Sequence, residues 1–297
     1  MRAIAILQVD AFTDRPFAGN PAGVVLDGAG LSEAEMQRIA AEMSLAATAF
    51  VSSPARPEAP LRLRWFTPAR ELTYCGHATV ATVHAMVEAG RLHGRRSVFD
   101  TLGGTLAAAV EPDEGGVLVW LEPAVPDLAP FSGPLEEILE ALGTRRASLG
   151  DWARPALTPE RDLLLPAGDL KTLHGLAPDM SRLGKLGETL KIRGACMLSL
   201  ETVEPGSATH CRFFAPHFGI PEDIVSGSVH SSIAVWLWAA GRLEPAGGRA
   251  AFTAEQGDVL GRPGRLRVEL DLSGGQPSRV RVGGRAVTVL SGSLRIG

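Results

Sequence analysis

The sequence predicts an α+β protein built from two copies of one unit, and three observations support this prediction. The pattern Arg-x-Phe-x-Pro occurs at 64–68 and again 148 positions later, at 212–216. Cys75-Gly76 and Ser226-Gly227, which are 151 positions apart, each open an apolar run with helical spacing. The repeat is about half the chain long, which is too long for a solenoid. A pseudo-symmetric pair of domains with a cleft between them is therefore expected.

The first copy begins with strands and a capped helix. Alternating apolar residues predict a strand over 4–9, and a loop punctuated by Pro and Gly leads to a second strand at 23–26. Ser32 and Glu35 form a capping-box pattern, in which each side chain bonds to the backbone of the other residue. A helix is therefore expected to begin after Ser32 and to run towards Ser44.

Alternation, helical spacing and turn residues predict the remaining elements. In the first copy these are a helix from Cys75 to near Gly90 and strands at 49–51, 61–66, 98–110 and 117–121. The proline-rich stretch 123–134 is the predicted hinge between the copies. In the second copy they are helices at 135–142 and 180–186, strands at 162–165, 197–201 and 209–214, and a terminal hairpin at 279–294 that turns at Gly283-Gly284.

The composition excludes several classes of protein. The 297 residues, 45% hydrophobic and 21% charged, suffice for two globular domains. The net charge of −4 and the lack of a basic tract argue against a nucleic-acid partner. Cys75, Cys196 and Cys211 are widely spaced and form no CxxC pair, so neither a disulfide framework nor a metal site is expected. Without a signal peptide or an apolar stretch of about 18 residues, the protein is predicted to be cytoplasmic and to have no membrane partner.

The two predicted helix starts indicate a small anionic ligand. A helix N-terminus presents free N–H groups and the positive end of the helix dipole, so two of them favour a carboxylate. Gly76 and Gly227 would let the ligand approach the backbone. The same field lowers the pKa of a thiol, which makes Cys75 a candidate acid/base group. In the alternative interpretation, Cys75 is a small buried turn residue and the repeat is only the remnant of an old duplication.

The motifs of the chain resemble those of one known family. They occur in family order from residue 9 to beyond 260, so the resemblance covers essentially the whole chain. The motifs are Val9-Asp10-Ala11-Phe12-Thr13, Gly19-Asn20-Pro21, Phe66-Thr67-Pro68, Cys75-Gly76-His77-Ala78-Thr79, Arg212-x-Phe214-x-Pro216, Glu222-Asp223-x-x-Ser226-Gly227-Ser228, Glu255-Gln256-Gly257 and Gly261-Arg262-Pro263. This set resembles the signature of the phenazine-biosynthesis (PhzF-like) isomerase family.

The resemblance implies a diaminopimelate-epimerase-like fold. In that fold two pseudo-symmetric domains, each an antiparallel sheet wrapped around a central helix, hold the active site between them. The first domain would contain residues 1–122 and a C-terminal strand at about 286–297, and the second would contain residues 123–285. The resemblance also implies proton transfer without a cofactor or a metal, and a homodimer. The expected partner is a small-molecule carboxylate substrate.

One position departs from the family pattern. Relatives usually carry Asn-Leu-Ser-Glu-Thr-x-Phe, in which the Glu moves the proton. This chain has Ser44-Leu45-Ala46-Ala47-Thr48-Ala49-Phe50, so Ala47 stands in place of the catalytic Glu. The usual Asp-Pro-x-Thr-Gly-Ser-Ala is also altered, to Asp223-Ile224-Val225-Ser226-Gly227-Ser228-Val229. The resemblance therefore predicts the scaffold of the family without its main acid/base group.

The remaining acid/base candidates are Asp223, His77 and Cys75, in that order of preference. His77 is expected to face the substrate and to titrate near neutral pH. Asp223 would face the same cleft, where burial beside a bound carboxylate would raise its pKa. Residues expected to bind the substrate are Asn20, Ala47, Gly76, Ser226, Gly227 and Ser228. The other histidines show no metal-ligand spacing and are expected to be structural or at the surface: His84, His93, His174, His210, His217 and His230.

Three functions are consistent with these residues. The favoured one is a cofactor-independent isomerase that shifts a proton and a double bond in a small unsaturated or cyclic carboxylic or amino acid of a biosynthetic pathway. The second is a dehydratase or epimerase that uses Cys75 as its acid/base group. The third is a ligand-binding homologue that has lost the chemistry, because the methyl group of Ala47 cannot move a proton.

Overall fold

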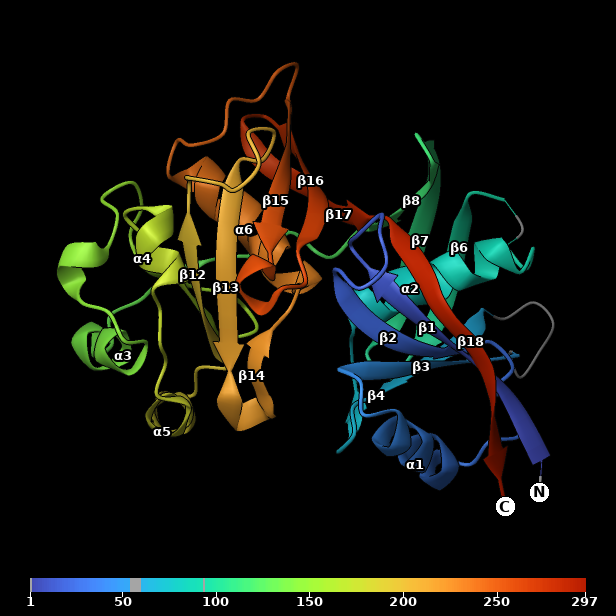
Figure 1. Cartoon of the computed structure of the whole chain (residues 1–297). Helices are drawn as coiled ribbons and strands as arrows, with labels where there is room; N and C mark the ends of the chain where they lie inside the picture. The colour runs from blue at the N-terminus through green and yellow to red at the C-terminus, as the bar shows by residue number, and fades with distance from the viewer. Residues whose placement is uncertain (1, 54–59, 93) are drawn as a thin grey trace. The chain divides into compact units, whose positions relative to one another are not determined.

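The computed structural model describes residues 2–53, 60–92 and 94–297 and divides the chain into two compact units. The first unit contains the chain up to Glu122 together with Gly283–Gly297, and the second contains Pro123–Val282. Figure 1 labels the helices and strands of both units. None of the helices in the described ranges is long and apolar enough to cross a membrane.

The first unit is a mainly antiparallel sheet with two helices. Its elements are β1 (Arg2–Ala11), β2 (Asn20–Val25), α1 (Glu33–Met43), β3 (Ala47–Ser52), β4 (Leu61–Phe66), β5 (Glu71–Leu72), α2 (Gly76–Glu88), β6 (Arg96–Thr101), β7 (Gly104–Asp113), β8 (Gly116–Leu121) and β18 (Ala286–Ile296). The predicted capping box of α1 is confirmed. Ser32 Oγ accepts the Glu35 N–H at 3.3 Å, and Glu35 Oε2 accepts the Ser32 N–H at 2.7 Å.

The second unit has a similar sheet and more helices. Its elements are β9 (Ala129–Pro130), α3 (Leu135–Ala141), η1 (Arg146–Ser148), β10 (Ala156–Leu157), β11 (Asp162–Pro166), α4 (Leu170–His174), α5 (Met180–Leu190), β12 (Gly194–Ser199), β13 (Thr209–Ala215), η2 (Pro216–Phe218), β14 (Ile220–Asp223), α6 (Gly227–Ala239), β15 (Arg249–Gln256), η3 (Asp258–Leu260), β16 (Gly264–Ser273) and β17 (Gln276–Gly284).

The two units share an order of strand pairing. In the first unit β2 runs parallel to β3, β3 antiparallel to β4, and β4 parallel to β6. The same pairings join β11, β12, β13 and β15 in the second unit. The helices before β3 and β12 each have 11 residues and end at a residue with left-handed backbone, Ser44 or Lys191. The repeat seen in the sequence is therefore a repeat of structure.

An arginine–glutamate ion pair is also repeated. Arg64 donates two hydrogen bonds of 2.6 Å to Glu71, and Arg212 donates two of 2.8 Å to Glu222. Each guanidinium lies 5.0 Å from the ring centroid of the phenylalanine two residues further along. The planar, bidentate geometry is the strong form of this interaction. The second copy has three more residues between its proline and its glutamate, and η2 begins at that proline, Pro216.

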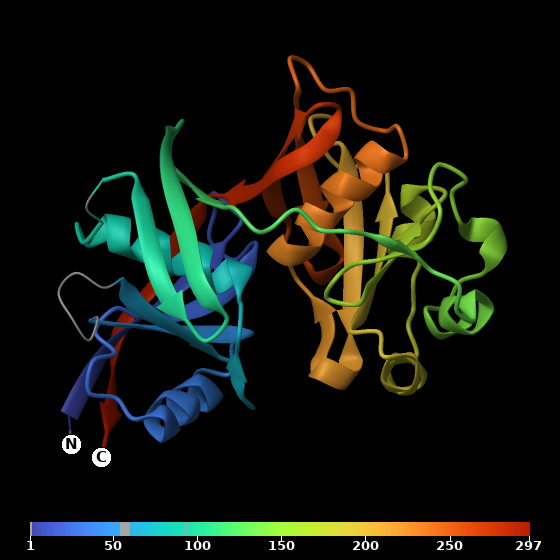
Figure 2. The same cartoon turned by 180° about the vertical axis from the view of Figure 1, so that it is seen from behind.

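Each sheet surrounds one buried helix. α2 is buried at residues 78–83, 85 and 86, and α6 is buried almost continuously from Val229 to Leu237. A helix that is apolar on every side has to lie inside the protein. α2 packs against β1, β2, β3, β8 and β18, while α6 packs on β12 and β13 (Figure 2). The predicted fold, a sheet around a central helix in each of two units, is confirmed.

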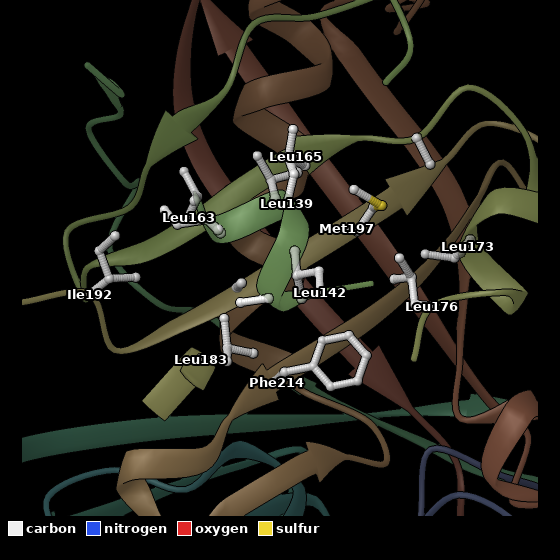
Figure 3. Close-up of a cluster of buried hydrophobic side chains, with 14 of the residues drawn as sticks. Leu139, Leu142, Leu163, Leu165, Leu173, Leu176, Leu183, Ile192, Met197 and Phe214 are labelled. Carbon is white, nitrogen blue, oxygen red and sulfur yellow. The ribbon is translucent and has the colours of Figure 1, made fainter. Parts of the chain in front are cut away.

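The sheet of the second unit is also covered on its other face. Leu164 of β11 points towards α6, whereas Leu163 and Leu165 point to a separate apolar cluster. Helices α3 and α5 supply the other side of this cluster, including Leu139 and Leu183 (Figure 3). β11 is therefore buried on both faces, and all five of its residues are buried.

The predicted hairpin around Gly283-Gly284 is wrong. Both glycines lie inside β17, and the chain turns at Gly274-Gly275, where φ is +59° and +78°. β18 pairs with β1 instead. The two glycines provide space, because a Cβ at Gly283 would lie 2.5 Å from Cε3 of Trp120 and one at Gly284 would overlap the Phe12 ring.

Gly283→Ala is expected to destabilise the protein by about 1–3 kcal/mol, because the added methyl group would overlap the buried Trp120 ring. Gly292→Ala is the matched control, since its added Cβ would meet only Leu290 Cδ2, at 3.9 Å. Urea denaturation monitored by tryptophan fluorescence measures both. Equal stabilities for the two variants would contradict the packing role of Gly283.

Candidate functional site

The first half-site, residues 75–79, is the start of α2. Cys75 is the N-cap, with extended backbone (φ −151°, ψ 101°), and its side chain does not cap the helix. The thiol points to the next turn, where Cys75 Sγ lies 3.5 Å from His77 Nδ1. Thr79 fixes the N-cap carbonyl by donating to it from Oγ1 at 2.7 Å. This leaves the first-turn N–H groups of α2 without a capping side chain, as an anion-binding helix start requires.

His77 is held in its neutral form. Burial lowers the pKa of His77 to about 4, so the expectation that it titrates near neutral pH is wrong. Within the described part of the chain, its Nε2 atom is buried and has no hydrogen-bond partner. With Nδ1 against the thiol, Nε2 is the ring atom that can bind a ligand. A neutral imidazole can donate or accept a hydrogen bond at Nε2, depending on its tautomer, without carrying a charge.

The second half-site, residues 223–230, is the start of α6 and repeats this geometry with other groups. Ser226 is an extended N-cap (φ −107°, ψ 101°) whose side chain does not cap the helix. Ser226 Oγ lies 3.5 Å from Ser228 Oγ, the same separation as between Cys75 and His77. His230 takes the place of threonine, with Nδ1 2.7 Å from the Ser226 carbonyl oxygen.

The chemistry of the two half-sites therefore differs. A thiol and an imidazole meet in the first, whereas two hydroxyls, which are hydrogen-bond donors and poor bases, meet in the second. The carboxylate of the second half-site belongs to Asp223, the last residue of β14 and a half-buried one. The negative charge of Asp223 helps to raise the pKa of the neighbouring His230 and Arg193. For both residues, burial and closer partners have larger effects on the pKa.

The other two predicted binding residues begin strands of the first unit. Asn20 starts β2 and Ala47 starts β3, and both are fully buried. Ala47 lies opposite Ala22 in the parallel pairing of β2 with β3. α2 packs on both strands, so these residues lie in the layer that supports the first half-site.

The remaining histidines have structural contacts. His210 is fully buried with Nδ1 2.8 Å from Glu255, His174 packs its ring against His210, and His84 lies 3.1 Å from Glu88. His217 packs against Phe218. His93 lies outside the described residues. Across the described ranges, no three His, Cys, Asp or Glu side chains are grouped to hold a metal ion.

Two connections were not predicted from the sequence. The contact between Cys75 and His77 depends on their positions as N-cap and second residue of α2, and Ser226 and Ser228 occupy the same positions in α6. Gln256 was noticed only as part of a motif, and yet its side chain contacts the second half-site. A glutamine followed by a glycine at the end of a strand was the one available signal.

Comparisons with known proteins agree with this geometry. Residues 9–292 match the family described as phenazine biosynthesis-like protein (PhzC-PhzF). A Deinococcus radiodurans protein named an uncharacterized isomerase is 37% identical over 290 residues, which cover 96% of this chain and 92% of that protein. The crystal structure of a PhzF-family protein of Bacillus anthracis has a TM-score of 0.91 at 28% identity, and each chain covers 100% of the other.

A more distant structure shares the fold alone. This is a hydroxyproline epimerase of Agrobacterium vitis, determined with bound trans-4-hydroxy-L-proline. It has a TM-score of 0.62 at 13% identity and covers 99% of this chain and 91% of its own.

His77 is expected to make the protein less stable as the pH falls. The unfolded chain binds the proton at a pKa of about 6.5, whereas folded His77 binds it at about 4, so the stability is complete above pH 6.5 and is lost between pH 6.5 and 4. The loss amounts to about 3 kcal/mol. His77→Gln should remove this part of the pH dependence in urea denaturation, while Cys75→Ser, which keeps the imidazole, should retain it. An unchanged slope in His77→Gln would show that His77 titrates normally.

Proposed function

Because the chain belongs to the phenazine biosynthesis-like PhzC-PhzF family, we propose that it is a cofactor-independent isomerase that moves a proton within a small carboxylic acid. The substrate class is an unsaturated or cyclic carboxylic or amino acid of a biosynthetic pathway, in which the proton transfer shifts a double bond. The observation that carries the proposal is the chemical difference between two equivalent helix starts.

The second half-site is suited to hold the substrate carboxylate. The start of α6 carries the positive end of the helix dipole, and the hydroxyls of Ser226 and Ser228 can donate to an anion. Gly227 lets the carboxylate approach the backbone N–H groups. The start of α2 at Gly76 offers a second set of N–H groups.

In the proposed reaction Asp223 removes a proton from carbon and the double bond shifts. A proton is then returned to a different carbon, so the substrate and the product have the same composition. In the first unit, neutral His77 can take up a proton at Nε2 and become a cation, which makes the Cys75–His77 pair a further acid/base candidate. The first unit thus supplies acid/base groups that the equivalent hydroxyls of the second unit cannot replace.

Asp223→Asn is expected to lower turnover by two or more decades, the usual contribution of a general base, with a smaller effect on KM. The assay incubates small dienoic and cyclic carboxylates in deuterated water and follows label entering one carbon of the product by NMR. Asp151→Asn, which changes an exposed carboxylate of the same unit, is the control. If no carboxylate in a broad metabolite set changes or takes up deuterium, the isomerase proposal fails.

A Cys75-dependent epimerase or dehydratase is the second candidate, and the contact of the thiol with His77 favours it. The fold is shared with a hydroxyproline epimerase. Cys75→Ala in the same deuterium assay separates the two functions. If Cys75→Ala lowers the rate by two or more decades while Asp223→Asn is still active, this candidate is supported. If Cys75→Ala leaves the rate unchanged, Cys75 is a packing residue.

Ala47→Glu is expected to impair turnover, because it would place a carboxylate at a position that is fully buried. Ala47→Ser is the matched control with a smaller polar side chain. The same assay tests the third candidate, a non-catalytic binding protein. That candidate requires an inert wild type and the appearance of isomerase activity in Ala47→Glu. The homodimer and the cytoplasmic location remain predictions from the sequence.

A further inference from the structure

We infer that Gln256 is a positioning residue whose buried side-chain amide sets the backbone conformation of residues 223–226, the loop between Asp223 and the start of α6. This inference rests on the proposed function of that loop. The amide lies at the end of β15 and is only 1% exposed, so its hydrogen bonds are made to protein groups that it can hold in place.

The two ends of the amide bind the two ends of the loop. Gln256 Oε1 accepts the Ser226 N–H at 3.0 Å, and Gln256 Nε2 donates to the Asp223 carbonyl oxygen at 2.7 Å. A planar amide keeps its donor and its acceptor at a fixed separation. One side chain therefore fixes the distance between the residue that carries the candidate base and the N-cap of the candidate anion site.

The backbone after Gln256 packs directly against the same loop. Gly257 has φ +92°, and a Cβ there would lie 2.8 Å from the Ile224 carbonyl oxygen. At Gly264 a Cβ would overlap Cγ2 of Val225. Ile224 and Val225, the middle residues of the loop, thus contact the backbone at Gly257 and Gly264, which have no side chains. The loop is held at its ends by hydrogen bonds and in its middle by close packing.

A buried thiol and imidazole complete the network. Cys211 donates from Sγ to Gln256 Oε1 at 3.5 Å, and the same Sγ lies 3.7 Å from His230 Nε2. Through Nδ1, His230 reaches the Ser226 carbonyl oxygen. Both backbone polar groups of Ser226 are therefore tied to one buried cluster.

The equivalent turn of the first unit has no amide side chain before its glycine. Its Gly103 makes a similar close approach, since a Cβ there would lie 2.5 Å from the Thr73 carbonyl oxygen. The residue before it is Leu102, whose side chain is 60% exposed and has no hydrogen-bonding group. The amide is thus a feature of the second unit, the unit that contains Asp223.

Gln256→Glu tests the inference because it keeps the shape of the side chain. A carboxylate can still accept the Ser226 N–H but repels the Asp223 carbonyl oxygen, whereas a protonated carboxyl regains one donor. At neutral pH the amide protection of residues 224–228, measured by hydrogen exchange against unfolded reference rates, is expected to fall roughly tenfold or more. It should recover as the pH falls below the pKa of the introduced Glu.

Gln256→Leu is the control, because its side chain has no group that could restore the amide protection at any pH. The pH profile of the wild type corrects for titration of the neighbouring Cys211, His230 and Asp223. In the wild type itself, the Nε2 protons of Gln256 should exchange slowly, so the inference stays testable even if a variant fails to fold. Rapid exchange of these protons, or unchanged protection in Gln256→Glu, overturns it. If protection changes as expected while Asp223→Asn keeps full turnover, the positioning role stands and the proposed base is wrong.

Discussion

Burial of an entire helix inside each sheet is the constraint on which the rest of the structure depends. α2 and α6 are buried over most of their length, so each needs strands around it and cannot lie on a surface. At the N-terminus of each helix a residue of intermediate exposure, His77 or Ser228, lies next to the buried turns. Neither N-cap side chain satisfies the free N–H groups there. The architecture therefore produces two helix starts of the kind that favours an anion.

The duplication preserves geometry and changes chemistry. The N-cap side chain lies 3.5 Å from the side chain two residues later in both units, although one pair is Cys75 with His77 and the other is Ser226 with Ser228. The arginine–glutamate pairs, by contrast, are kept in both residue type and geometry. Residues that support the sheet are thus conserved between the copies, and those at the helix starts have diverged.

Local signals were predictable from the sequence, and contacts between distant residues were not. The capping box of Ser32 and the helix starts depend on neighbours within four residues, and the structure confirms them. Gly283 was misjudged because glycine serves both turns and close packing, and only the fold brings Trp120 against it. The neutral state of His77 depends on burial, which no spacing reveals. Gln256 meets the second half-site from 30 residues away, so its role required the structure.

The pairing of β1 with β18 also determines the order in which the protein assembles during synthesis. Ile4 lies opposite Leu294, so the ribosome makes the whole second unit before the partner of β1 emerges. The second unit is continuous in sequence and can fold as soon as it is complete, whereas the first has to wait for β18. Until then the apolar β1 has an open edge, the kind of surface that recruits other chains.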